Sequence, residues 1–245
     1  MRIYTSFKDA LNETCREVFT RGRTVFDKTV QGRIVEGKEF EQKEIIGYGF
    51  TVVIKNLDEM LKEMMDYARE IFEKDWLTSE VGDKWFKEML EPKNPDEWWK
   101  GTGLEEYWKG FGIEDDGRFS YTYGERLSIT IPQVIQCLKR NKYMRGAVAT
   151  AYESSKDLSS MGKRRTPCTM YFQFLIRSEL DKDTLTTIYT ARSQDLVSFF
   201  PLDIYKAAKL GQYIADKVEV KFKYYMHFVG SLHCYKKDIP KDRQW

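Results

Sequence analysis

The chain has 245 residues, of which 42% are hydrophobic and 15% aromatic, a composition typical of a globular protein with a substantial core and not of a disordered chain. Its 40 basic and 38 acidic side chains give a formal charge of +2, so it lacks the general basic field of a dedicated nucleic-acid binder. No apolar run approaches the length of a membrane span, and the first residues lack the apolar core of a signal peptide, so we expect a soluble, cytoplasmic protein.

The first part of the chain predicts a helix, a strand and a second helix. Residues 6–20 space their apolar side chains as a surface helix does. A glycine-punctuated stretch follows and ends in a strand-like run at 44–54. Asn56 or Asp58 is a candidate cap for a helix over 57–72. The apolar stripe of that helix comprises Leu57, Leu61, Met64, Met65 and Ala68.

Residues 92–124 mix Pro, Gly, Trp, Tyr and acidic side chains. The segment resembles a linker in composition, but so many aromatic side chains would be poorly used in solvent, so we interpret it as a structured loop against a pocket. The elements expected after it are a helix at 132–141, strands at 146–152, 169–177 and 184–192, a long helix from near Pro201 to 218, and a strand at 224–235. Strands with helices placed irregularly among them indicate an α+β fold, with a mixed β-sheet flanked by helices in a single domain over 1–245.

Cys168 is the first candidate for chemistry. It follows Arg164, Arg165, Thr166 and Pro167 at the start of a predicted strand. Guanidinium groups beside a thiol favour the nucleophilic thiolate, whereas an arbitrary free cysteine is more often a small core residue. We expect free thiols and no metal site, because no CxxC pair is present and histidines are few. The cysteines and histidines are Cys15, Cys137, Cys168, Cys234, His227 and His233.

Two further groups of polar side chains lie late in the chain. Arg192 and Ser193 open the segment RSQD at a predicted strand end, where a guanidinium and a hydroxyl suit a phosphate, although an Arg-Ser pair is more often surface decoration. His233 and Tyr235 alternate with apolar residues, so both point to one face of a strand. Two polar rings on one face suit sugar hydroxyls; the alternative is a half-exposed edge strand.

Together these segments resemble the thymidylate synthase family. They are PC-x-x-x-FQF at 167–174, RS-x-D at 192–195, an Asn or Asp eleven residues after that arginine, and G-x-x-H-x-Y at 230–235. The combination is far more specific than any one part. The resemblance covers the chain from about Trp108 onward. It implies the thymidylate synthase fold and a homodimer in which sheet faces pack together.

In that family a cysteine adds to C6 of a pyrimidine deoxynucleotide, and C5 then reacts with 5,10-methylenetetrahydrofolate, the co-substrate. The resemblance assigns the attack to Cys168 and catalytic roles to Tyr123 and Asp203. A catalytic glutamate normally follows the first long strand; Glu63 is the candidate, because EMMDY resembles a motif of the phage deoxycytidylate hydroxymethylases, and a solvated glutamate is the alternative. The implied substrate-binding residues are Lys28, Arg145, Gln173, Arg192, Ser193, His233 and Tyr235, and the implied folate-binding residues are Trp108 and Asp195.

The chain also departs from the family pattern. The paired arginines that reach the partner's phosphate occur here as Met144-Arg145, so one is missing, and Arg164 or Arg165 is a candidate substitute. Lys28 is the nearest match to the N-terminal phosphate loop. Its competitors are Arg21, Arg23 and Arg33.

Asp203 stands where the synthases acting on uridylate have an asparagine. A carboxylate accepts from the amino group of cytosine, so Asp203 predicts deoxycytidylate as substrate; a helix cap near Pro201 is the alternative. Only ten residues follow Tyr235, a poor lid against water, which favours a hydroxymethylated product. The competing interpretations are a C5-methyltransferase on the same scaffold and an inactive nucleotide- or RNA-binding homologue.

Overall fold

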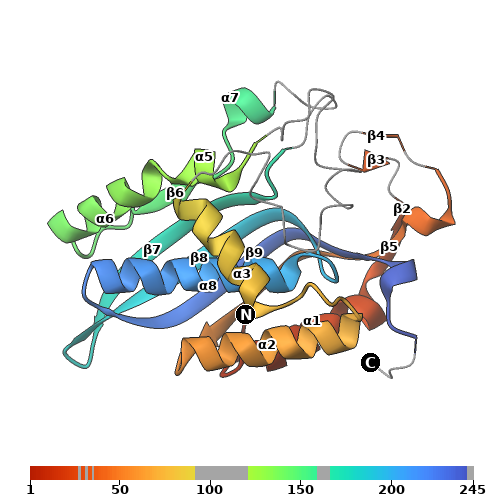
Figure 1. Cartoon of the computed structure of the whole chain (residues 1–245), viewed down its shortest axis with the longest axis horizontal. Coiled ribbons are helices and arrows are strands. Elements are labelled where there is room, and N and C mark those ends of the chain that lie inside the picture. The colour runs from red at the N-terminus through yellow and green to blue at the C-terminus, as the bar shows by residue number, and fades with distance from the viewer. Residues whose placement is uncertain (27–28, 31–32, 35, 92–120, 159–165, 242–245) are drawn as a thin grey trace.

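A computed structural model describes residues 1–26, 29–30, 33–34, 36–91, 121–158 and 166–241 (Figure 1). Its largest feature is a seven-stranded sheet in the order β1-β5-β9-β8-β7-β6, with β2 also paired to β5. The strands are β1 (Arg2–Tyr4), β2 (Arg23–Phe26), β5 (Glu41–Val53), β6 (Val148–Thr150), β7 (Thr169–Glu179), β8 (Lys182–Asp195) and β9 (Lys221–Tyr235). A separate two-stranded sheet pairs β3 (Thr29–Val30) with β4 (Arg33–Ile34).

The sheet is mixed, as the sequence predicted. β5 pairs antiparallel with β9, and β7 with both β6 and β8, whereas β8 and β9 run parallel, as do β1 and β5. Parallel neighbours need a crossover connection, and α8 (Phe200–Lys217) supplies it between β8 and β9. The remaining helices are α1 (Phe7–Arg21), α2 (Leu57–Phe72), α3 (Ser79–Leu90), α5 (Tyr123–Leu127), α6 (Thr130–Arg140) and α7 (Ser154–Asp157), with 3-10 turns η1 (Lys38–Phe40) and η2 (Lys236–Asp238).

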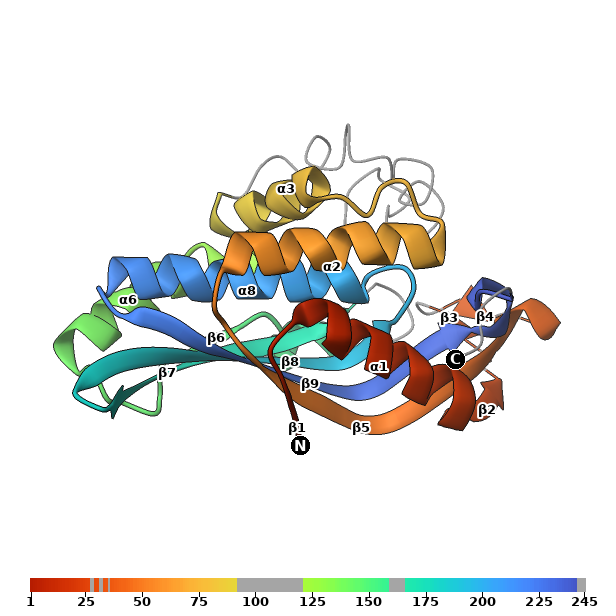
Figure 2. The ribbon, with the colours of Figure 1, turned by 90° about the horizontal axis from the view of Figure 1, so that it is seen from below.

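Helices α1, α2, α3 and α8 lie on the same side of the sheet (Figure 2). The α1 helix begins where Ser6 Oγ accepts from the backbone N–H of Asp9 at 3.2 Å, a common N-cap arrangement. Gly211 lets α8 approach the sheet closely, because a Cβ there would meet Thr187 Oγ1 at 2.5 Å. Within the described ranges, none of the helices combines the length and apolarity that crossing a membrane requires.

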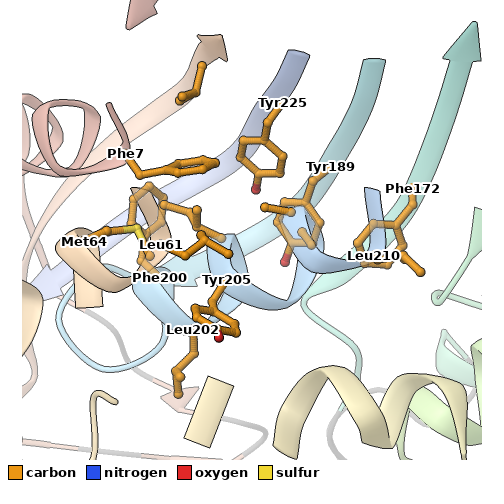
Figure 3. Packing of buried hydrophobic residues seen from close by; sticks show 14 of the residues in the cluster. Phe7, Leu61, Met64, Phe172, Tyr189, Phe200, Leu202, Tyr205, Leu210 and Tyr225 are labelled. Atoms are coloured by element: carbon orange, nitrogen blue, oxygen red, sulfur yellow. The ribbon is translucent and has the colours of Figure 1, made fainter. Parts of the chain in front are cut away.

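The core lies between this helical layer and the inner face of the sheet. Cross-strand pairing places Phe172, Tyr189, His227 and Phe50 in one row across β7, β8, β9 and β5, and each is buried. Figure 3 shows Tyr225, Tyr189 and Phe172 projecting from neighbouring strands towards Leu210 and Phe200 of the α8 region. The two polar side chains in this row, Tyr189 and His227, therefore sit beneath α8.

The structure also differs from the sequence-based expectations at several elements, including β1 and α5, which were not anticipated. Helix α3 was not anticipated, and it packs against α8 and α5. The short helix α7 lies between the strands expected at 146–152 and 169–177, where the sequence analysis named no helix. Strand β8 continues through RSQD to Asp195 instead of ending before it, because pairing with β9 extends to Asp195 and His233. The predicted loop at 92–124 lies almost entirely outside the described residues.

Candidate active site

Cys168 lies immediately before β7, next to Arg192 of β8. The backbone N–H of Arg192 donates to the Cys168 carbonyl at 2.9 Å. The Arg192 guanidinium also donates from Nε to the Pro167 carbonyl at 2.9 Å and from Nη2 to the Thr166 carbonyl at 3.1 Å. The cysteine-bearing segment is therefore held against the predicted phosphate-binding arginine.

Tyr123, the first residue of α5, reaches the same segment. Thr122 and Glu125 form a reciprocal capping box that fixes the start of this helix. The Tyr123 hydroxyl accepts from the backbone N–H of Thr169 at 3.3 Å. Burial raises the pKa of Tyr123, and the charges of Cys168 and Asp203 raise it further. Three predicted residues therefore lie close enough to interact, because the charges of Cys168 and Asp203 both act on Tyr123.

Asp203 lies in the first turn of α8 and is buried. Its Oδ2 accepts from Gln194 Nε2 at 2.7 Å, and its Oδ1 lies 2.5 Å from Lys206 Nζ. The Lys206 ammonium also lies 4.2 Å from the centre of the Tyr123 ring. The helix begins without a side-chain cap, so Asp203 does not act as the helix cap that was the alternative interpretation.

A chain of buried polar groups extends from Asp203 into the sheet. Gln194 Oε1 lies 2.6 Å from His227 Nε2, and His227 Nδ1 lies 2.7 Å from the Tyr225 hydroxyl. Burial lowers the pKa of His227 to about 3, so its imidazole is neutral near pH 7. Gln194 Nε2 also lies 3.3 Å from the Tyr189 hydroxyl. These bonds hold Gln194, and through it Asp203, in one orientation.

Glu88 of α3 is a candidate site residue that the sequence-based prediction missed. It is buried, and its Oε1 accepts from the Gly124 backbone N–H at 2.8 Å, beside Tyr123. Burial raises the pKa of Glu88, while this hydrogen bond and the charge of Lys206 act in the opposite direction. Glu63, the predicted catalytic glutamate, is instead exposed on α2. The sequence did contain a signal for Glu88. The apolar residues of 79–90 have helical spacing, and Glu88 lies three residues after Trp85, on the buried face of that helix.

The phosphate and sugar candidates gather where β8 and β9 end. Ser193 Oγ lies 3.4 Å from His233 Nδ1, and the rings of His233 and Tyr235 are 6.2 Å apart. Their sheet neighbours Leu232 and Cys234 are fully buried while both rings are half-buried, the alternation that the sequence predicted. Asp195, the folate candidate, accepts at Oδ1 from the backbone N–H groups of Val197 and Ser198, so it fixes the turn into α8.

Gln173 and Arg145 lie apart from this group. Cross-strand pairing places Gln173 beside Ile188, one residue out of step with Phe172 and Tyr189, so its side chain points to the opposite face of the sheet. Its Nε2 donates to the Arg145 carbonyl at 2.8 Å. Within one chain, Gln173 therefore does not face Asp203. Lys28 and Trp108 lie outside the described residues.

Comparisons with known proteins identify the family of the chain. The family model for thymidylate synthase matches residues 11–244. Two relatives are both described as "Putative thymidylate synthase". The protein from Methanosarcina barkeri is 34% identical over 49% of this chain and 55% of its own length. The protein from Methanocaldococcus jannaschii is 34% identical over 48% of this chain and 52% of its own length. The matched segment spans about half the length of each relative. The structure of thermostable thymidylate synthase A from Bacillus subtilis superposes with a TM-score of 0.64 at 15% identity, over 98% of this chain and 85% of that one. The chain belongs to the thymidylate synthase family.

Proposed function

We propose that this chain transfers one carbon from 5,10-methylenetetrahydrofolate to C5 of a pyrimidine deoxynucleoside monophosphate, with Cys168 as the nucleophile. The observation that supports this most directly is the contact between Tyr123 and Thr169, because it joins the tyrosine to the backbone that bears Cys168. Family membership supports the same chemistry. The folate co-substrate supplies the carbon, and its binding rests on the family alone, since Trp108 lies outside the described residues and Asp195 is engaged in a turn.

Each group of the site has a role in this proposal. Cys168 adds to C6 of the base. Glu88, whose pKa is raised by burial, is suited to exchange a proton with the base. Ser193 binds the phosphate with Arg192, and His233 binds the sugar with Tyr235. Glu88 takes the place of Glu63, because only Glu88 is buried beside Tyr123.

Methyl transfer to deoxyuridylate is the first form of this activity. The names of both archaeal relatives favour it. Hydroxymethylation of deoxycytidylate is the second form, and the specific observation in its favour is the carboxylate of Asp203 where an amide is expected. A homodimer in which Arg145 reaches the partner's phosphate site completes the proposal.

Tritium release from C5 tests the activity. Deoxyuridylate and deoxycytidylate labelled at C5 are incubated with enzyme and methylenetetrahydrofolate, and the folate product is identified. We expect release from one nucleotide, dihydrofolate if the product is methylated, and tetrahydrofolate if it is hydroxymethylated. Cys168→Ala is expected to bind nucleotide and release no tritium, because attack and phosphate binding use separate groups. Release at the wild-type rate by that variant excludes the mechanism, and no release by the wild type indicates an inactive homologue.

A further inference from the structure

Lys206 is a buried cation at the centre of the site, and no motif pointed to it. Its side chain is 1% exposed, and lysine is almost never so deeply buried without a specific partner. Within the part of the chain that the structure describes, Nζ contacts Asp203 as an ion pair but completes no hydrogen bond. Its other close neighbours are two aromatic faces, with the Tyr123 ring centre at 4.2 Å and the Trp85 ring centre at 5.3 Å. An ammonium with three donors therefore has donor capacity left at this buried position.

We propose that Lys206 donates to O4 of a uracil base while Asp203 accepts from N3–H, so that this pair together reads the base. The inference rests on the proposed function and identifies the substrate class. A carboxylate alone complements the amino group of cytosine. A carboxylate beside an ammonium offers one acceptor and one donor side by side, which is the complement that a single asparagine amide offers to uracil.

The positions of the two side chains decide which of them faces O4. C4 of the base adjoins C5, the reacting carbon, whereas N3 is one atom further away. Lys206 packs on Tyr123, whose hydroxyl reaches the backbone beside Cys168, and the charge of Lys206 also acts on Glu88. Asp203 is held on its other side by Gln194 of β8. Lys206 is thus the member of the pair on the reacting side, and an amino group at C4 would set two donors against each other.

The same placement serves the chemical step. When the Cys168 thiolate forms a bond to C6, the π electrons of C5–C6 move to C4–C5 and those of the carbonyl move to O4. No atom leaves and nothing is oxidised; negative charge develops on O4. A preorganised ammonium at O4 stabilises that charge in a site shielded from water. Lys206 therefore contributes both to base selection and to the rate of the attack.

The competing explanation is that Lys206 only neutralises buried Asp203. The two explanations differ in what happens when the ammonium is removed. If Lys206 reads O4, Lys206→Met leaves a lone carboxylate, which favours cytosine, and the ratio of kcat/KM for deoxyuridylate to that for deoxycytidylate falls by about 10- to 100-fold. If the pair does not face the base and Lys206 only neutralises Asp203, both nucleotides lose activity by the same factor.

The experiment measures kcat/KM for both nucleotides in the wild type, Lys206→Met and the double variant Asp203→Asn/Lys206→Met. The wild type is expected to prefer deoxyuridylate. The double variant restores a donor and an acceptor through one amide and is expected to recover that preference. It also removes the unpaired carboxylate, so we expect it to fold even if Lys206→Met does not. Lys209→Met is the matched control one turn away on α8, where Lys209 pairs with exposed Asp58 at 2.8 Å, and it should leave the ratio unchanged.

The outcomes separate the two proposals. Turnover of neither nucleotide by the wild type overturns the proposed function itself. Turnover with a preference for deoxycytidylate, an unchanged ratio in soluble Lys206→Met, or a double variant that prefers deoxycytidylate overturns the role of Lys206 and leaves the one-carbon transfer standing. A fall in the ratio in Lys206→Met with recovery in the double variant supports the assignment.

Discussion

Gln194 donates from Nε2 to Asp203 Oδ2 across 2.7 Å, and this bond ties the end of β8 to the first turn of α8. Because the amide nitrogen faces a carboxylate, the amide oxygen faces His227, so the His227 proton resides on Nε2 and the Tyr225 hydroxyl donates to Nδ1. Because Asp203 is an acceptor, the donor and acceptor of each hydrogen bond from Gln194 through His227 to Tyr225 are fixed.

Gln194→Met is expected to destabilise the protein. The substitution keeps the side-chain volume but leaves the buried Nε2–H of His227 without its acceptor, at a cost of roughly 1–3 kcal/mol. Urea denaturation measures the free energy of unfolding. Gln212→Met is the control, because Gln212 makes an exposed bond to Asp216 on the same helix, and its effect should stay within about 0.5 kcal/mol. Equal effects from the two substitutions would show that the buried hydrogen bonds of Gln194 add no stability.

The stability of the protein should fall in acid partly because of His227. Its pKa is about 3 in the folded state against 6.5 for the free side chain, so the unfolded chain binds a proton first as the pH falls between these values. The free energy of unfolding therefore decreases with falling pH in that window, and His227 contributes its full stabilisation above pH 6.5. His227→Gln should show a shallower dependence in denaturation measured from pH 7 to pH 4. Identical slopes for the two proteins would contradict a buried neutral imidazole.

Glu88→Gln tests the glutamate that the structure places beside Tyr123. Loss of a proton-transfer group should lower kcat by about 10²- to 10⁴-fold, whereas Glu63→Gln, on the exposed side of α2, should retain wild-type activity.

Glu88→Gln should also change the stability of the protein in a pH-dependent way. A carboxyl whose folded pKa is raised is less costly to bury when protonated, so Glu88 destabilises the fold at high pH and this cost disappears as the pH falls towards 4.5. Glu88→Gln should thus raise Tm at pH 8 and not at pH 4.5. A wild-type kcat in Glu88→Gln would show that another residue carries out the proton transfer.

Subunit mixing tests the homodimer. Arg145 is exposed at a loop before β6, and its carbonyl binds Gln173 on the outer face of the sheet. If Arg145 completes the partner's site, mixing Arg145→Ala with Cys168→Ala subunits restores activity, because one site in each hybrid has both intact residues. Activity is measured by tritium release before and after exchange. No recovery in a mixture shown to exchange subunits, or a monomer by light scattering, would place the phosphate site within one chain.

The order and type of most elements followed from sequence pattern alone. The apolar stripe of α2 and the long runs of β5, β7, β8 and β9 are strong local signals, because their buried faces repeat with the period of a helix or a strand. Several candidate site residues could also be proposed from the sequence, because their motifs resemble those of one family. They are Cys168, Tyr123, Arg192, Ser193, Asp203 and His233. Helix α3 was missed because mixed polar and aromatic residues obscure its stripe.

The chemistry of Asp203 shows what the sequence by itself determined and what only the tertiary structure decided. The sequence determined that a carboxylate stands eleven residues after Arg192, and taken alone that carboxylate indicates cytosine. The tertiary structure placed Lys206 against one oxygen and Gln194 against the other, and it buried Glu88 beside Tyr123 while leaving Glu63 exposed. Hydrogen-bonding character depends on which groups share a buried space, and residues from separate strands and helices enter that space only when the chain folds.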